Sequence, residues 1–185
     1  KIVMTQGKIE FGNIIEDEDK MRLLTALNIK ESDLLDGYKI QIVSTGHSKV
    51  MIGIKNIETL NSLKPDYGAL SKLSGIIKCN GYYVFTVNSQ EADILINGRM
   101  FAPAVGINED PVTGNANGPL GAYLVHYNHV EHNNSLYKFK IKQGEGINRA
   151  GIIEVEVNIE DGKPVEVKIC GDAVIVFKSE LVLSV

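Results

Sequence analysis

The residues of this sequence that could do chemistry gather around one acid, Asp110, in the stretch Asn-Glu-Asp-Pro-Val-Thr-Gly. Asp110 precedes Pro111, which restricts the backbone and favours an extended conformation for the residue before it. Thr113 is a favourable N-cap for the helical pattern that follows, over roughly residues 113–129. The spacing therefore predicts a proton-carrying carboxylate beside the beginning of a helix.

The beginning of this helix is also suited to an anion. Gly114, Asn115 and Ala116 follow Thr113 without bulk, so a ligand can approach the free backbone N–H groups of the first turn. Such a helix end attracts carboxylate or phosphate. Acid/base chemistry next to a substrate carboxylate needs this combination. We therefore take Asp110 as the candidate catalytic residue, and Thr113, Gly114, Asn115 and Ala116 as candidate substrate-binding residues.

A simpler interpretation of the same stretch is a turn before a helix, in which Asp110 caps the helix or faces water. The protonation of Asp110 has two interpretations as well. A nearby helix N-terminus stabilises the ionised form, which suits a base, whereas burial would raise the pKa, as an acid requires. Both pairs of alternatives stay open at the level of sequence.

Arg99 is a further candidate substrate-binding residue, because a guanidinium can pair with the acid of a substrate. The alternative is a structural ion pair between this strand arginine and Glu109 or Asp110.

The histidines and cysteines favour structural interpretations. His126, His129 and His132 have a spacing that a metal site could use, but at the end of a helix a solvated cluster that complements the helix dipole is favoured. Cys79 and Cys170 lie in apolar, strand-like segments rather than in a Cys-x-x-Cys motif. We expect no metal and no cofactor.

Periodicity predicts the elements that position these residues. A helix is expected over 17–29, and two short helices, broken at Pro65, over 57–73. An extended entry strand is expected over 1–12, and 82–88 with 93–101 as a strand pair. The remaining expected β segments are 38–46, 48–54, 137–144, 151–158, 164–171 and 173–183.

Alternating apolar and polar residues on both sides of Asp161-Gly162 predict a hairpin with one solvent-facing side. We expect antiparallel sheets, and see no βαβ alternation that would indicate a doubly wound parallel sheet. The fold class is therefore α+β, with residues 1–185 as one domain.

The composition excludes several classes of protein. The 185 residues carry 19 basic and 23 acidic side chains, a net charge of −4, so a nucleic-acid partner is not expected. No apolar run approaches the roughly 20 residues of a membrane helix, and the first residues do not resemble a signal peptide. We expect a cytoplasmic protein without a membrane partner.

The segment from Gly98 to Leu124 resembles the signature of the PhzF-like, phenazine biosynthesis-like family, which is Arg-x-Phe-Ala-Pro, then Glu-Asp-Pro-Val-Thr-Gly-Ser-Ala, then a helix. Gln143 to Gly151 resembles the Gln-Gly-x-x-x-x-Arg strand turn of that family, and residues 41–54 resemble its Val-Ser-Thr-Gly strand. The match is specific in the first of these segments.

The resemblance implies the diaminopimelate epimerase fold, in which two similar lobes each form an antiparallel β barrel or cone around a central helix. This chain resembles the C-terminal lobe, and 1–12 and about 173–185 are expected as strands that would pair with an N-terminal lobe. By the same resemblance, Asp110 is an acid/base or proton-relay group, and the amides of residues 114–116 bind a carboxylate. The implied activity is a cofactor-free isomerase or epimerase.

The sequence also departs from the family pattern. The Ser-Glu-Thr and Gly-His-Pro-Thr motifs of the first lobe are absent, and His47 belongs to the Val-Ser-Thr-Gly strand, so it is expected to be a surface histidine. The usual Ser-Ala-His-Cys is Asn-Ala-Asn-Gly at residues 115–118.

These departures set the expected partners. We expect activity on a small carboxylate-bearing metabolite only when a separate N-terminal lobe or a second copy of the chain, as a homodimer, completes the site. The alternative is a catalytically inactive binding or assembly module that keeps the anion-binding helix end.

Overall fold

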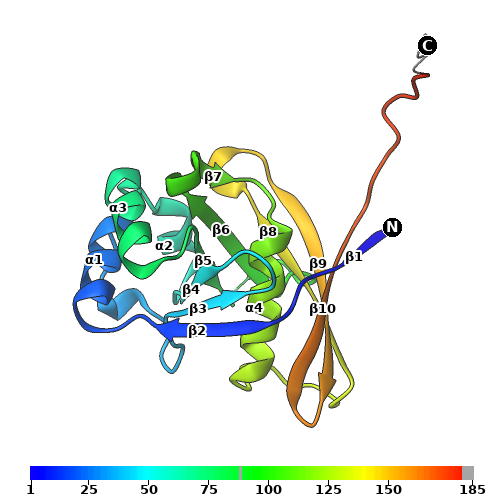
Figure 1. Ribbon diagram of the computed structural model, residues 1–185, viewed down its shortest axis with the longest axis horizontal. Helices are drawn as coiled ribbons and strands as arrows, with labels where there is room; N and C mark the ends of the chain where they lie inside the picture. The colour runs from blue at the N-terminus through cyan, green and yellow to red at the C-terminus, as the bar shows by residue number, and fades with distance from the viewer. Residues whose placement is uncertain (88, 181–185) are drawn as a thin grey trace, which may run out of the picture.

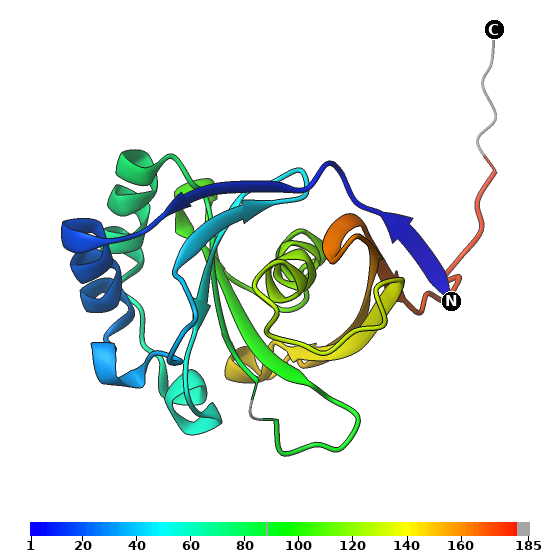
Figure 2. The ribbon, with the colours of Figure 1, turned by 90° about the horizontal axis from the view of Figure 1, so that it is seen from below.

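The computed structural model describes residues 1–87 and 89–180. A curved sheet wraps around one central helix, α4 (Gly114–His126), and three further helices pack outside the sheet (Figures 1 and 2). The outer helices are α1 (Asp17–Leu27), α2 (Ile57–Ser62) and α3 (Tyr67–Ile77). The strands are β1 (Ile2–Thr5), β2 (Glu10–Ile14), β3 (Gln41–Ser44), β4 (Lys49–Gly53), β5 (Tyr82–Thr86), β6 (Ile96–Ala102), β7 (Ile107–Asp110), β8 (Leu136–Gln143), β9 (Gly151–Glu160) and β10 (Lys163–Gly171).

The sheet is mixed rather than wholly antiparallel. Its order is β1-β10-β9-β8-β6-β5-β4-β3-β2, with β7 paired to β6. The pairs β4/β5 and β6/β8 are parallel, so the expectation of antiparallel sheets is wrong at these two junctions. The physical reason is the length of the connections. Each parallel pair is joined by a crossover that contains a helix, which lets the second strand run in the direction of the first.

Both faces of the central strands are covered, which explains their continuous apolar sequences. On β5, Tyr83 and Phe85 belong to the cluster around α4, whereas Tyr82 and Val84 belong to the cluster under α1–α3. All four side chains are fully buried. Successive residues of a strand point to opposite faces, so this sheet separates an inner core from an outer core.

Helix α4 is enclosed by the sheet, as Figure 2 shows in a view turned from that of Figure 1. Ala116 to Val125 are all buried. Gly121 permits the close approach, because a Cβ there would lie 2.8 Å from Val155 and 2.9 Å from Val157 of β9. The expected α+β fold with a β barrel or cone around a central helix is confirmed as a half-barrel.

Most of the expected elements are confirmed, including the first helix, the two helices separated at Pro65 and the β5/β6 pair. The hairpin between β9 and β10 is also confirmed. Asp161 and Gly162 have φ values of 48° and 73°, the left-handed values that a type I′ turn requires at both positions.

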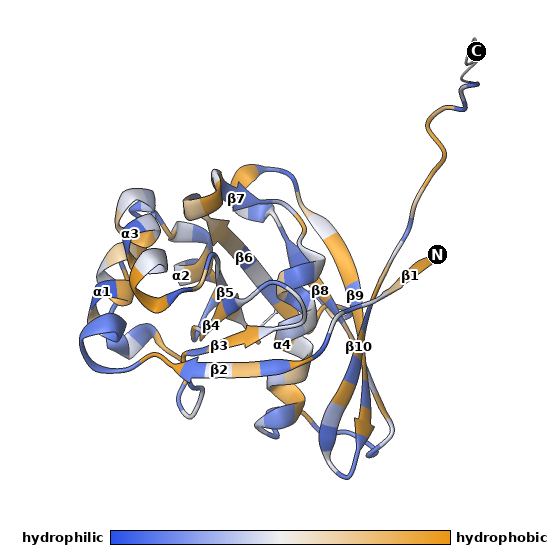
Figure 3. Cartoon of the chain, in the orientation of Figure 1, coloured by the Kyte–Doolittle hydropathy of each residue, from blue (hydrophilic) through white to orange (hydrophobic). Residues whose placement is uncertain are grey.

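The chain ends differ from expectation. Residues 1–12 form two strands instead of one, since β1 pairs with β10 and β2 pairs with β3. The expected strand over 173–183 is wrong for its described part, where 173–180 has no regular structure, and 181–183 lie outside the described residues. β1 occupies the edge of β10 where this tail begins, and among the described residues the segment 173–180 pairs with no strand. The expected pairing of the tail with an N-terminal lobe stays a prediction. The tail leads away from the sheet as an apolar segment (Figure 3).

No helix in the described ranges is both long and apolar enough to cross a membrane.

Candidate active site

Asp110 lies at the end of β7 and lines a pocket of about 470 Å³. The pocket is bounded by the turn before β4, the ends of β6 and β7, and the start of α4. Its lining residues are Gly46, His47, Ser48, Lys49, Asn80, Met100, Ala102, Val105, Ile107, Asp110, Thr113 and Asn115. The carboxylate therefore faces a cavity with the volume of a small-molecule site, rather than only open solvent.

Thr113 occupies the N-cap position of α4, with an extended backbone at φ −127° and ψ 105°. Its side chain does not cap the helix, contrary to the expected N-cap role. The hydroxyl instead donates to Asp110 Oδ2. Gln143 Nε2 donates to Thr113 Oγ1 at 3.0 Å, so the hydroxyl hydrogen is directed to the carboxylate. Thr113 thus positions the Asp110 carboxylate.

The first turn of α4 offers two free amides rather than three. The N–H groups of Ala116 and Asn117 both donate to the carbonyl oxygen of Thr113, at 3.2 and 3.1 Å. Within the described part of the chain, the N–H groups of Gly114 and Asn115 have no acceptor. Ala116 is also fully buried, so the structure does not support the expected substrate contact from this residue.

Three fully buried polar side chains, those of Tyr83, Asn117 and Gln143, connect through hydrogen bonds to Thr113 and Asp110. The Tyr83 hydroxyl donates to Asn117 Oδ1, and Asn117 Nδ2 donates to Gln143 Oε1 at 2.9 Å and to the carbonyl oxygen of Thr113 at 2.9 Å. Gln143 Nε2 also donates to the Asp110 carbonyl oxygen at 2.7 Å. We call Tyr83, Asn117, Gln143 and Thr113 the relay network.

The relay network fixes Asp110 at its backbone and at one carboxylate oxygen. Burial raises the pKa of Tyr83 far above its ordinary value, so its phenol remains a donor. Among the described residues Asp110 Oδ1 has no hydrogen-bond partner, which leaves this atom available to a ligand.

Two glycines let these groups meet. A Cβ at Gly98 would lie 2.1 Å from the Tyr83 hydroxyl, so the phenol reaches Asn117 only because position 98 has no side chain. Gly144 has a φ of +90°, and a Cβ there would lie 2.6 Å from the carbonyl oxygen of Pro111. The turn after Gln143 can therefore approach the backbone that leads from Asp110 into α4.

Arg99 forms a buried ion pair rather than part of the pocket wall. Its Nε and Nη2 donate to the two carboxylate oxygens of Glu109, at 2.9 and 2.7 Å. Its Nη1 donates to the carbonyl oxygens of Leu60 and Leu63, both at 3.0 Å. The geometry favours the structural alternative over a substrate contact, because this side chain is 6% exposed and already bound on three sides.

The histidines at the end of α4 pack against aromatic rings. His126 stacks on Phe11 with ring centroids 4.0 Å apart, and His129 stacks on Tyr38 at 3.7 Å. His126 is exposed, as expected of a solvated cluster, whereas His129 is half-buried. Burial lowers the pKa of both imidazoles, which disfavours the cationic form that would complement the helix dipole. His47 is confirmed as an exposed turn residue, although it also lines the pocket.

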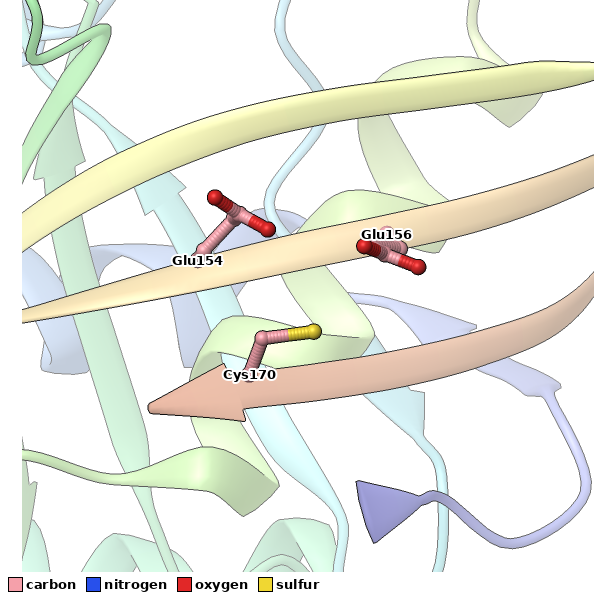
Figure 4. A group of neighbouring side chains, drawn as sticks. All are labelled: Glu154, Glu156 and Cys170. Carbon is pink, nitrogen blue, oxygen red and sulfur yellow. The ribbon is translucent and has the colours of Figure 1, made fainter. Parts of the chain in front are cut away.

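One other group of side chains has the residue types of a metal site. Ligand atoms of Glu154, Glu156 and Cys170 lie within 4.8 Å of one another on β9 and β10 (Figure 4). However, Lys1 pairs with Glu154 at 2.5 Å and Lys138 pairs with Glu156 at 2.6 Å. Burial raises the pKa of the Cys170 thiol, which disfavours the thiolate that a metal would need. The group is therefore a charge-balanced part of the sheet surface.

Sequence reasoning missed the supporting residues of the site. For Tyr83 the sequence predicts only a place in the strand over 82–88, and Gln143 and Asn117 enter only as parts of motifs. A signal was present in the sequence, because Gln143 ends an otherwise alternating strand and Asn117 interrupts an apolar helix. A buried amide needs polar partners, so two such residues near one acid indicate a shared network.

Comparisons with known proteins show which family this chain resembles. An uncharacterized isomerase of Clostridium acetobutylicum is 72% identical over 184 residues, which cover 100% of this chain and 61% of that protein. The uncharacterized isomerase YddE of Escherichia coli is 44% identical over 180 residues, covering 97% of this chain and 60% of that protein. The trans-2,3-dihydro-3-hydroxyanthranilate isomerase of Pseudomonas chlororaphis is 29% identical over 164 residues, 88% of this chain and 53% of that protein.

The chain thus spans about 60% of the length of its more similar relatives. A PhzF-family phenazine biosynthesis protein of Bacillus anthracis has the same fold, with a TM-score of 0.78 at 25% identity, over 90% of this chain and 56% of that chain. Residues 11–179 match the PhzC-PhzF family, described as phenazine biosynthesis-like protein. Since this match includes the acid, the helix start and the relay network, the chain belongs to the PhzC-PhzF family of phenazine biosynthesis-like proteins.

Proposed function

We propose that this chain provides part of the proton-transfer site of a cofactor-free isomerase that acts on a small carboxylate-bearing metabolite. The observation that carries the proposal is the position of Asp110. It lines a pocket, one of its carboxylate oxygens accepts from Thr113, and the pocket lining also includes Asn115, whose N–H is one of the two free amides at the start of α4.

In the proposed mechanism, Asp110 Oδ1 exchanges a proton with a carbon of the bound substrate. The Thr113 hydroxyl donates to the other carboxylate oxygen, Oδ2, and the relay network holds the Thr113 oxygen in place. The two free amides bind the substrate carboxylate, because the helix dipole favours an anion at this end. Binding and orientation then bring the reacting carbon to the acid/base group.

An isomerase must remove a proton at one position and return it at another, which is easier with two groups. Asp110 is the only carboxylate among the described lining residues of the pocket. We propose that a second acid/base group comes from a segment like the part of the longer relatives that this chain does not cover, or from a second copy of the chain. The greater length of those relatives supports the first source.

The volume of the pocket and the name of one relative support a class of substrate. The relative from Pseudomonas chlororaphis is named for trans-2,3-dihydro-3-hydroxyanthranilate, a ring with one carboxylate. A pocket of about 470 Å³ lies within the usual range for ligands of this size. We propose a substrate that shares this carboxylate and has, near it, a carbon that can lose a proton.

The test is incorporation of solvent deuterium. The chain is assayed alone and co-expressed with the segment of the Clostridium acetobutylicum relative that it does not cover. The substrates are a panel of 2-amino and 2-hydroxy acids together with trans-2,3-dihydro-3-hydroxyanthranilate. We expect deuterium at the carbon next to the carboxylate, and a rate about a hundredfold to ten-thousandfold lower in Asp110→Asn.

The matched control is Asp36→Asn, whose side chain is 93% exposed and lies outside the pocket, and its rate should be unchanged. Exchange that persists in Asp110→Asn would refute the role of this acid. No exchange with any substrate, in either form of the protein, would instead favour a binding or assembly module.

A further inference from the structure

Lys49 is a buried lysine whose role is not explained by the fold. It begins β4 and is 6% exposed. A Cβ at Gly81 would lie 2.3 Å from Lys49 Cδ and 2.7 Å from Cε, so the stem of the lysine occupies the space that a side chain at position 81 would need. The absence of a side chain at Gly81 therefore makes room for a buried cation at this position.

The ammonium group of Lys49 is bound only by backbone oxygens. Its Nζ donates to the carbonyl oxygen of Ser48 at 3.2 Å and to that of His47 at 3.4 Å. An ammonium has three donors, so one is left over. Among the described residues no carboxylate forms an ion pair with Lys49. Burying a lysine without a carboxylate is unfavourable, which makes a ligand the natural partner for its charge.

Lys49 lines the same pocket as Asp110. Burial lowers the pKa of Lys49, while Cys79 and then Asp110 act in the opposite direction. Within the described lining, Lys49 is the only lysine or arginine and Asp110 the only acid. The pocket thus contains one cation and one anion that do not form an ion pair.

A carboxylate ligand would meet an electrostatic problem in this pocket without Lys49. Its negative charge would be repelled by the Asp110 carboxylate, and two neutral amides offer only partial positive charge in return. An ammonium in the same pocket offsets that repulsion, and its low exposure protects it from screening by salt.

We propose that the Lys49 ammonium binds the carboxylate of the substrate, together with the free amides at the start of α4. This inference rests on the function proposed above, and adds the residue that makes the pocket selective for an anion over a neutral ligand of the same shape. Lys49 is then a substrate-binding residue, while Asp110 transfers the proton.

The experiment compares two probes of nearly equal shape by titration calorimetry on the whole chain. Anthranilate carries a carboxylate, and 2-aminobenzamide carries an uncharged amide in its place. We expect the wild-type chain to bind anthranilate at least tenfold more tightly than 2-aminobenzamide. Lys49→Met should weaken anthranilate binding tenfold or more and leave 2-aminobenzamide binding unchanged.

The matched control is Lys8→Met, whose lysine side chain is 85% exposed and lies outside the pocket, and it should bind both probes as the wild type does. The proposal is overturned if the wild type does not prefer anthranilate. It is also overturned if Lys49→Met binds anthranilate normally, or loses affinity for both probes equally, which would indicate packing rather than charge recognition.

A second measurement needs no substitution at Lys49. The pKa of Lys49, followed by the carbon-13 shift of its Cε, should rise when anthranilate is added, because a nearby anion favours the charged ammonium. The pKa of Lys8 should stay the same, and an unchanged pKa at Lys49 would contradict the proposal. If exchange persists in Asp110→Asn while the Lys49 result is positive, the pocket binds an anion but Asp110 does not transfer the proton. The hypotheses for Asp110 and Lys49 can therefore fail separately.

Discussion

Tyr82 and Tyr83 are neighbours on β5, and both are fully buried, but they serve opposite faces of the sheet. On the outer face, the Tyr82 hydroxyl donates to the carbonyl oxygen of Leu70 at 2.8 Å and lies 3.0 Å from Ser74 Oγ. These bonds connect α3 to the sheet, and they end there. The outer tyrosine therefore has a purely structural set of partners.

On the inner face, the Tyr83 hydroxyl donates to Asn117, from which the relay network continues through Gln143 and Thr113 to Asp110. Its last member lines the pocket. Buried polar groups in this fold therefore differ in the groups to which their hydrogen bonds connect them. Bonds that close within the core stabilise it, whereas bonds that lead to a cavity also fix the geometry of a site.

The largest expected effect comes from the buried ion pair of Arg99 and Glu109. Arg99 holds Glu109, next to the site, and the carbonyl oxygens of Leu60 and Leu63 at the end of α2. Arg99→Met leaves the Glu109 carboxylate buried and unpaired, which should cost about 3–5 kcal/mol in the free energy of unfolding. Urea unfolding measures this loss. The double variant Arg99→Met/Glu109→Leu should regain most of it, and a double variant as unstable as the single one would show that the unpaired charge is not the cause.

The next prediction tests whether a buried amide of the relay network contributes to the site as well as to stability. Gln143→Leu removes the donors to Thr113 and Asp110 and the acceptor of Asn117, and should cost about 1–3 kcal/mol in unfolding free energy. It should also slow deuterium exchange, because the Thr113 hydroxyl is no longer held toward Asp110. Gln41→Leu is the matched control, since this buried amide bonds Gly12 and Tyr127, away from the pocket. Equal exchange rates in the two variants would contradict a role for the relay network.

A smaller effect tests the two tyrosines directly. Tyr82→Phe and Tyr83→Phe each remove one hydroxyl and should each lower the unfolding free energy by about 1 kcal/mol. Only Tyr83→Phe should slow deuterium exchange, since only its hydroxyl belongs to the relay network. If both variants exchanged at the wild-type rate, the inner tyrosine would be as purely structural as the outer one.

The smallest expected effect is a pH dependence. Burial raises the pKa of Tyr82 to about 12, while an unfolded tyrosine ionises near pH 10. Between these values the unfolded state loses its proton first, so the contribution to stability is complete below about pH 10 and is lost as the pH rises toward 12. The urea midpoint should fall between pH 9 and pH 11, and fall less in Tyr82→Phe. An identical slope in both proteins would count against this assignment.

Local patterns predicted most of the fold, because the period of the apolar residues reports on which side of an element is buried. The β9/β10 hairpin and the helix after Thr113 follow from such patterns. The two parallel junctions do not, since the direction of a pairing depends on how distant segments meet. The tail at 173–180 has the composition of a strand, but a strand also needs a free edge to pair with, and β1 occupies that of β10.

For the site, the sequence identified the acid and the helix beside it, and the structure places Asp110, Thr113 and Asn115 on one pocket. It did not indicate that the Thr113 hydroxyl turns to Asp110, because that choice depends on Gln143, which lies on another strand. The involvement of Lys49 was missed for a similar reason. Its burial results from the contact with Gly81, which periodicity does not reveal.

The most direct test of the central claim is a nitrogen-15 NMR titration of the chain with anthranilate. The central claim is that the start of α4, beside Asp110, binds an anion. The amide signals of Gly114 and Asn115 should then shift most and saturate together, while that of Ala116, which donates to Thr113, should shift less. Saturating shifts that are confined to residues outside the pocket, or no shift at Gly114 and Asn115, would contradict the claim.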